Sequence, residues 1–309
     1  MSKKIIYKWD PSWGWNNKIY YLGATSDNKT PFWLKKAYLY CDDKIELYTP
    51  ENSRLCAGSF TNNLYYGSLS YDLYRSRLET YIDQSIFVCD KSWKISAEFR
   101  PSKFFKKPNK YLSNIKYLDN LIVPFRDPTP ISGANKLAVC TGGFRWGLSG
   151  NVCEVESVNN RFSITRETIL EKNMRIFDEI ERCTFWNEYM FFSARKKGNL
   201  QINKIQVAKL NRNGFYSYFG EVKNSENLYG PCLNANLELL YWYQGLHVIS
   251  KNPNDEKLIF ENNEWILKGR KYIWYCYMPK IIEKTSNQII FFPKKKFKKF
   301  IKNYFNRDA

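Results

Sequence analysis

Carboxylates beside arginine and aromatic residues are the feature of this sequence that could do chemistry. The clearest case is the segment Phe177–Arg182, which holds three carboxylates and an arginine directly before an aromatic, strand-like run. Asp10 and Asp127 each stand before a proline at the opening of another block of predicted strands. Glycosidic bond chemistry needs one ionised carboxylate and one protonated carboxyl group. With Glu181 of the first segment, the three positions therefore predict a site for glycosyl transfer.

Each acidic position taken alone has a simpler explanation. Asp10 and Asp127 precede proline, a pairing that is common at the start of turns. Glu181 and Arg182 could form a surface ion pair that contributes little to stability. The catalytic interpretation is favoured because one shared site accounts for all three positions.

The composition favours one large all-β domain. The chain has 309 residues, of which 17% are aromatic, and this length can bury a full hydrophobic core. The eight cysteines stand singly, without a CxxC pair, and His247 is the only histidine, so the usual ligand set for zinc is missing. We therefore expect reduced thiols, no metal and no cofactor.

Short runs rich in aromatic and β-branched residues alternate with polar turns, which predicts strands almost throughout. Distinctive segment openings recur about every 50 to 70 residues, the span of a four-stranded propeller blade. The five openings are Asp10, Gly58–Ser59, Asp127, Glu181 and Gly230–Pro231. We predict an all-β, five-bladed β-propeller over residues 1–285, with a β-sandwich as the alternative. Because the first strands of all blades start at one end of the central channel, the three carboxylates would meet there.

These segments resemble the fructosyl-transferring glycoside hydrolases of family 68, the levansucrases and their relatives, and more distantly the invertases of family 32. Asp178–Arg182 reads Asp-Glu-Ile-Glu-Arg, Arg126–Pro128 reads Arg-Asp-Pro, and Trp9–Asp10 matches the Trp-Asp of the family's first blade. The resemblance implies a five-bladed propeller. It also implies that Asp10 is the nucleophile, Asp127 stabilises the transition state and Glu181 is the general acid/base.

The resemblance further implies contacts to the sugar from residues around this trio. Those residues are Trp9, Ser59, Arg126, Glu179 and Arg195. The family's second-blade element Trp-Ser-Gly-Ser appears here as Cys56–Ser59, so two sucrose contacts are missing. The part of the pocket that binds the fructosyl unit would be kept, and the part that binds the glucosyl unit of sucrose would be altered. The donor could therefore be sucrose or a nucleotide-activated fructose.

The C-terminal segment concentrates positive charge. The whole chain carries +18, and between Pro293 and Ala309 six lysines and Arg307 oppose Asp308 alone, a net +6. In a helix the apolar residues of this segment share one face and the lysines the other, a pattern typical of a helix lying in a membrane surface. We predict such a basic amphipathic helix within residues 286–309, with a disordered tail as the alternative. Its predicted membrane contacts are Lys294, Lys295, Lys296, Phe297, Lys298, Lys299, Phe300, Ile301 and Tyr304.

The net charge calls for an anionic partner. The sequence has no signature of a nucleic-acid-binding module or a nucleotide-binding loop, and the basic stretch 100–116 reads more simply as a solvated loop than as a phosphate grip. No run reaches the roughly 20 apolar residues that span a bilayer, and the first residues lack the apolar core of a secretory signal. We expect a cytoplasmic protein on the inner face of the cell membrane, without a nucleic-acid partner.

Together these features predict a retaining fructofuranosyltransferase. Its acceptor would be a polysaccharide of the capsule or lipopolysaccharide type. A sucrose- or fructan-cleaving hydrolase and a non-catalytic propeller that binds glycans are the alternatives.

Overall fold

Strands make up nearly all of the regular structure in the described part of the chain. The computed structural model describes residues 6–25, 37–42, 44–50, 53–70, 84–99, 125–131, 135–141, 150–159, 161–197, 204–226, 228–243, 248–250, 257–269 and 273–275. Within these ranges the helical elements are two short 3₁₀ turns, η1 (Trp15–Asn17) and η5 (Lys172–Ile176). The predicted all-β class is therefore confirmed, and no helix in these ranges is long and apolar enough to cross a membrane.

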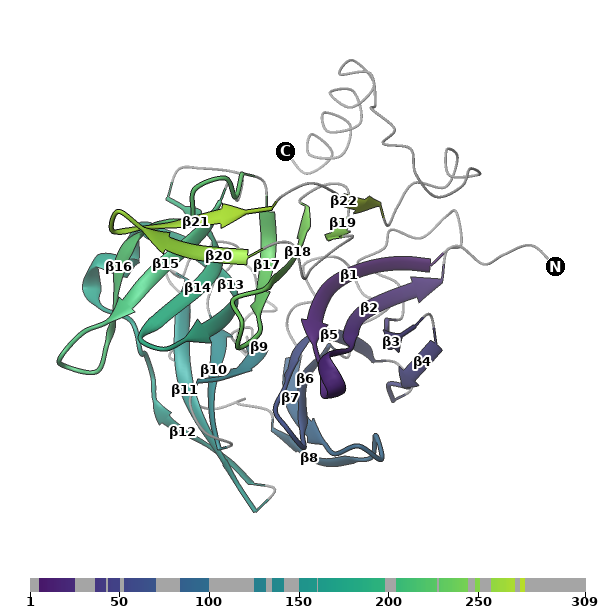
Figure 1. The fold of residues 1–309 in the computed structure, drawn as a ribbon. Coiled ribbons are helices and arrows are strands. Elements are labelled where there is room, and N and C mark those ends of the chain that lie inside the picture. Colours follow the sequence, from purple (N-terminus) through teal and green to yellow (C-terminus); the bar gives the residue numbers. More distant parts are fainter. Residues whose placement is uncertain are drawn as a thin grey trace, which may run out of the picture. The chain divides into compact units, whose positions relative to one another are not determined.

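Four sheets of four strands follow one another along the chain, from purple to green in Figure 1. In each sheet, strands that are consecutive in sequence pair antiparallel. The first two sheets are β1 (Ile6–Trp13), β2 (Ile19–Thr25), β3 (Tyr38–Cys41) and β4 (Lys44–Leu47), then β5 (Arg54–Phe60), β6 (Tyr65–Ser70), β7 (Gln84–Cys89) and β8 (Ile95–Phe99). The next two are β9 (Phe125–Pro130), β10 (Lys136–Thr141), β11 (Asn151–Val158) and β12 (Arg161–Arg166), then β13 (Phe177–Trp186), β14 (Tyr189–Lys196), β15 (Ile205–Leu210) and β16 (Tyr216–Glu221).

The described residues after β16 form three sheets of two strands each. They are β17 (Leu228–Leu233) with β18 (Leu239–Tyr243), β19 (Val248–Ser250) with β22 (Ile273–Tyr275), and β20 (Lys257–Glu261) with β21 (Glu264–Lys268).

The first strands of the sheets form a closed circuit of contacts. β1 contacts β5, β5 contacts β9, β9 contacts β13, β13 contacts β17, and β17 contacts β1. Successive antiparallel sheets whose first strands meet around a common centre make a β-propeller, whereas a sandwich would stack two sheets face to face. Four sheets have the four strands of a full blade, and β17 with β18 occupies the place between the fourth and the first.

Burial explains why the middle strands are so apolar. Every residue of β6 is buried, and so are the first six of β14, because neighbouring sheets cover both faces of these strands. The outer strands β8 and β12 instead alternate between exposed and half-buried residues, as expected at a sheet edge with one face in water.

Two parts of the sequence-based prediction lie outside the described residues. These are the basic stretch 100–116 and the amphipathic helix within 286–309. The chain separates into a compact unit, Met1–Tyr277, and a second unit, Met278–Ala309. The predicted division at residues 285 and 286 stays a prediction.

Candidate active site

Strand pairing is interrupted in the first strand of each four-stranded sheet and of the β17–β18 pair. The interruptions lie between Trp9 and Ser12, Cys56 and Gly58, Arg126 and Thr129, Glu181 and Cys183, and Tyr229 and Cys232. Such β-bulges bend a strand and redirect its side chains. The five segment openings read from the sequence coincide with these five interruptions.

At three of these bulges a residue other than glycine has a left-handed backbone. The φ angles are 45° for Asp10, 55° for Asp127 and 42° for Arg182. Aspartate adopts this conformation more readily than most residues, because its short side chain bonds locally. Arginine has no such advantage, and a left-handed non-glycine residue costs on the order of 1–3 kcal/mol. Surrounding contacts must therefore hold Arg182 in place.

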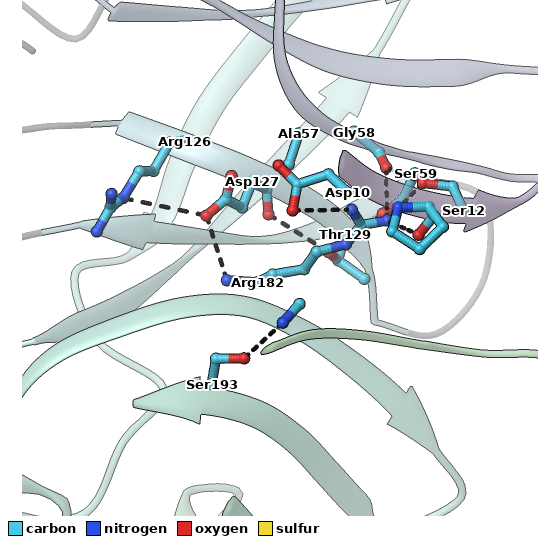
Figure 2. Close-up of polar contacts among 12 residues, drawn as sticks. Asp10, Ser12, Ala57, Gly58, Ser59, Arg126, Asp127, Thr129, Arg182 and Ser193 are labelled. Atoms are coloured by element: carbon cyan, nitrogen blue, oxygen red, sulfur yellow. Dashed lines mark hydrogen bonds and ion pairs between the residues drawn. The ribbon is translucent and has the colours of Figure 1, made fainter. Parts of the chain in front are cut away.

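Arg182 contacts two of the predicted catalytic positions, Asp10 and Asp127, as Figure 2 shows. Its backbone N–H donates to Oδ2 of Asp127 at 3.2 Å, and its Nη1 lies 3.6 Å from Oδ1 of Asp10. Its side chain is only 2% exposed, which excludes the surface ion pair considered above. Glu181 joins Asp10 and Asp127 in one cluster through Arg126, which faces the carboxylates of both Glu181 and Asp127. Asp10 and Asp127 lie inside strands, not in turns.

Arg126 holds the two glutamates of β13. Its Nη2 lies 3.0 Å from Oε1 of Glu179, its Nη1 lies 2.9 Å from Oε1 of Glu181, and its Nε lies 4.0 Å from Oδ2 of Asp127. Arg195 from β14 pairs with the second carboxylate oxygen of Glu179. Glu179 is thus held between two guanidinium groups, while Glu181 shares one.

This arrangement gives the two glutamates opposite protonation preferences. Burial raises the pKa of Glu181 well above its usual range, and the neighbouring Glu179 and Asp127 add to the rise despite the opposing charge of Arg126. Burial also opposes ionisation of Glu179, but Arg126, a hydrogen bond from Glu181 and Arg195 outweigh it and lower the Glu179 pKa. These opposite shifts favour the protonated form of Glu181 and the ionised form of Glu179. A neutral acid beside ionised carboxylates is the combination that glycosidic chemistry requires.

The remaining predicted sugar contacts lie on the same strands. Ser59, 8% exposed, has its hydroxyl 3.3 Å from that of Thr129, which links β5 to β9. Trp9 lies in β1, where its backbone pairs with Leu22. The predicted membrane-contacting residues of the C-terminal segment lie outside the described residues.

Sequence reasoning missed the role of Arg182 and the part played by Ser12 and Gly58. Ser12 donates from Oγ to the Gly58 carbonyl at 2.9 Å and accepts a hydrogen bond from Arg182. A side chain does not fit at Gly58, because a Cβ there would lie 2.4 Å from the Tyr65 hydroxyl. The only signal in the sequence was that Gly58 aligned with the other segment openings.

None of the predicted site residues lines an open cavity of about 510 Å³. Its lining includes Asn151, Glu171, Arg175 and Phe215.

Comparison with known proteins finds similarity in structure but not in sequence. No protein-family model matches the sequence, and no curated protein matches it. An exo-β-1,3-galactanase from Clostridium thermocellum is similar with a TM-score of 0.47 and 11% identity, over 85% of this chain and 63% of that chain, so less than two thirds of it is matched. An α-L-arabinofuranosidase from the same organism has a TM-score of 0.44 at 13% identity, over 86% of this chain and 93% of that one.

A GH43 endo-arabinanase from Bacillus licheniformis has a TM-score of 0.42 at 11% identity, over 87% of this chain and 97% of that one. Because these TM-scores are below 0.5, the propeller assignment rests on the strand order and on the circuit of first strands described above.

Proposed function

We propose that this chain is a retaining fructofuranosyltransferase on a five-bladed propeller, which transfers β-fructofuranose to a capsule- or lipopolysaccharide-type glycan. One observation carries the glycosyl-transfer part: protonated Glu181 and ionised Glu179 lie in one cluster with Asp10 and Asp127. The fructosyl part rests on the sequence motifs around Asp10, Asp127 and Glu181.

The residues divide the reaction into two displacements. Asp10 attacks the anomeric carbon of the donor while Glu181 gives its proton to the departing glycosidic oxygen. The fructosyl unit is then bound covalently to Asp10. In the second step Glu181 accepts the proton of the acceptor hydroxyl, the hydroxyl oxygen attacks the same carbon, and the Asp10 carboxylate leaves. Asp127 accepts hydrogen bonds from the sugar hydroxyls.

Product analysis tests the proposal directly. The protein is incubated with sucrose or a nucleotide-activated fructose, with and without a glycan acceptor, and each ligand is also tested for its effect on Tm, since a ligand of the folded form raises it. Fructose attached to the acceptor supports transfer. Free fructose alone, regardless of acceptor, would establish the hydrolase alternative. A raised Tm with glycan but no turnover of any donor would establish the binding propeller.

The charge balance of the site favours a donor with an uncharged leaving group. With Glu181 protonated, the carboxylates of Asp10, Asp127 and Glu179 face an equal number of guanidinium groups, those of Arg126, Arg182 and Arg195. A phosphate would have to compete with Glu179 for Arg195. Sucrose therefore fits the site better than a nucleotide sugar does.

Arg195→Ala is accordingly expected to lower kcat/KM for sucrose by about 10- to 100-fold, the loss of one hydrogen bond to a charged group. Turnover by the unmodified protein should barely change with salt, because buried charges are weakly screened. The control is Lys196→Ala, whose side chain is 42% exposed and pairs with Glu221, and it should keep full activity. Turnover confined to the nucleotide sugar, with a steep decline in salt, would reverse the donor assignment.

The membrane association that we propose rests on the charge pattern of the C-terminal segment. Deleting residues 293–309 removes a net charge of +6, and each basic residue contributes about 1 kcal/mol near an anionic surface. Binding to anionic liposomes, measured by co-sedimentation, should therefore fall sharply, while turnover of a soluble acceptor and the Tm stay unchanged. A truncated protein that melts much lower yet binds liposomes equally well would show that the segment packs on the propeller.

A further inference from the structure

Arg182 contacts the proposed nucleophile, the proposed transition-state stabiliser and the main chain that follows the nucleophile. We propose that Arg182 is the positioning residue that keeps Asp10 ionised and fixes the β1 bulge that aims it. This inference rests on the proposed function, in which Asp10 is the nucleophile.

The guanidinium group reaches two different strands. Its Nη2 donates to the Pro11 carbonyl at 2.9 Å, to the Gly58 carbonyl at 3.3 Å and to the Ser12 hydroxyl. Pro11 and Ser12 directly follow Asp10 within the bulge, so these bonds restrain the backbone that carries the carboxylate (Figure 2). The planar fork lets Nη1 face Asp10 while Nη2 bonds to the main chain, and lysine, which has a single nitrogen, could not make both sets of contacts.

Because Arg182 is buried, its positive charge needs a negative charge beside it. An arginine cannot give up its proton in a protein, and a buried charge is tolerated only when an opposite charge and hydrogen bonds accompany it. Asp10 supplies the nearest opposite charge on the side of Nη1, at 3.6 Å. Folding of this site therefore favours the ionised form of Asp10, the form that a nucleophile needs.

Other titratable groups lie close to the pair. Burial raises the pKa of both the Cys56 thiol and the Tyr65 hydroxyl, which stay neutral. The Asp127 carboxylate opposes a second negative charge, and Arg54 lies against the Cys56 sulfur. Among the described residues, the charged and titratable groups around Asp10 and Arg182 include Arg54 and Cys56 of β5, Tyr65 of β6, Asp127 of β9 and Cys232 of β17.

The test follows the ionisation of Asp10 and the pH dependence of turnover in parallel. Selective ¹³C labelling of aspartate carboxyls, with Asp10→Asn to assign the resonance, gives the pKa of Asp10 by NMR. In Arg182→Gln that pKa should rise by about one to three units, the effect of losing an opposite charge within 6 Å. The acid limb of kcat/KM should move upward by the same amount.

Two further variants separate charge from shape. Arg182→Lys should leave the Asp10 pKa near its wild-type value and lower kcat about tenfold or more, because it keeps the charge and loses the forked contacts. Arg166→Gln is the control. Arg166 donates to the Gly214 carbonyl and stacks on Phe215, so both readouts should stay unchanged.

The proposal is overturned if Asp10 titrates equally in the wild type and in Arg182→Gln. It is also overturned if Asp10 of the wild type titrates at or above about 3.9, the value of an unperturbed aspartate, and this measurement stands even if Arg182→Gln fails to fold. The NMR titration needs no substrate. A depressed Asp10 pKa without turnover of any donor would therefore support the role of Arg182 and reject the proposed function.

Discussion

Replacing Glu181 with glutamine is expected to slow turnover by about 10²–10⁴-fold, the usual contribution of a general acid. The side chain keeps its shape, and its amide can still donate a hydrogen bond to Glu179, but it has no proton to give to the leaving oxygen. Kinetics with a fructosyl fluoride provide the decisive comparison. Fluoride leaves without protonation, so the first step should be largely preserved with this donor and lost with sucrose.

The pH dependence follows from the same group. Because burial raises the pKa of Glu181, wild-type kcat/KM should fall only at a pH above the usual range of glutamate, and Glu181→Gln should lack that alkaline limb. A group with a raised pKa in the folded state contributes stability that is full below its unfolded pKa and is lost as pH rises through the folded value. As pH increases, the Tm of the wild type should therefore fall relative to the Tm of Glu181→Gln.

Glu188→Gln is the matched control, since Glu188 lies in the turn after β13, pairs with Lys209 and is 51% exposed. It should retain full activity. A loss below tenfold in Glu181→Gln, or an equal loss with the fluoride and with sucrose, would remove Glu181 from the acid role.

Replacing Asp10 with asparagine should abolish turnover, by about 10⁶-fold, the scale seen when another enzyme loses its nucleophile. Asparagine tolerates the left-handed backbone that Asp10 adopts, with φ at 45°, but it takes one opposite charge from the buried Arg182, so the Tm should fall while the chain still folds. Mass spectrometry of digested protein reports the mechanism. In Glu181→Gln treated with fructosyl fluoride, one hexosyl unit should accumulate on the peptide that contains Asp10, and the additional Asp10→Asn change should eliminate it.

Asp42→Asn is the control for this substitution, because Asp42 also has a left-handed backbone, with φ at 49°, and is exposed. Neither its Tm nor its activity should change appreciably. A hexosyl unit found on Asp127 or Glu179 instead would assign the nucleophile to that residue.

The strands that are buried on both faces could be predicted, because they appear in the sequence as continuous apolar runs. Aromatic and β-branched runs such as Ser85–Cys89 and Lys136–Cys140 gave strands β7 and β10. The first strands were harder to predict. β9 reads Phe-Arg-Asp-Pro-Thr-Pro, and two prolines in six residues are typical of a turn. Proline is tolerated here because the strand bulges at that point.

The candidate site could be predicted in part, and the limit was strand register. The motifs identified Asp10, Asp127 and Glu181, which depend on residue type and order. The motifs do not show which residues the Arg182 side chain contacts. In a regular strand neighbouring residues point to opposite faces, so the direction of each side chain depends on where the strand bulges. The bulge between Glu181 and Cys183 changes that alternation, and the guanidinium of Arg182 reaches Asp10 and the carbonyls of Pro11 and Gly58 instead of Glu181.

The repeated bulge also bears on how such a protein can evolve. Gly230 occupies the place in β17 that Asp10 and Asp127 occupy in their strands, with φ at 60° and a proline after it, and aspartate tolerates that backbone. A single substitution could thus add or remove an acidic group at this centre without rebuilding any sheet. The architecture separates the scaffold from the chemistry: the same backbone turn recurs in the first strands β1, β9, β13 and β17, and the reaction is decided by which side chain stands on it.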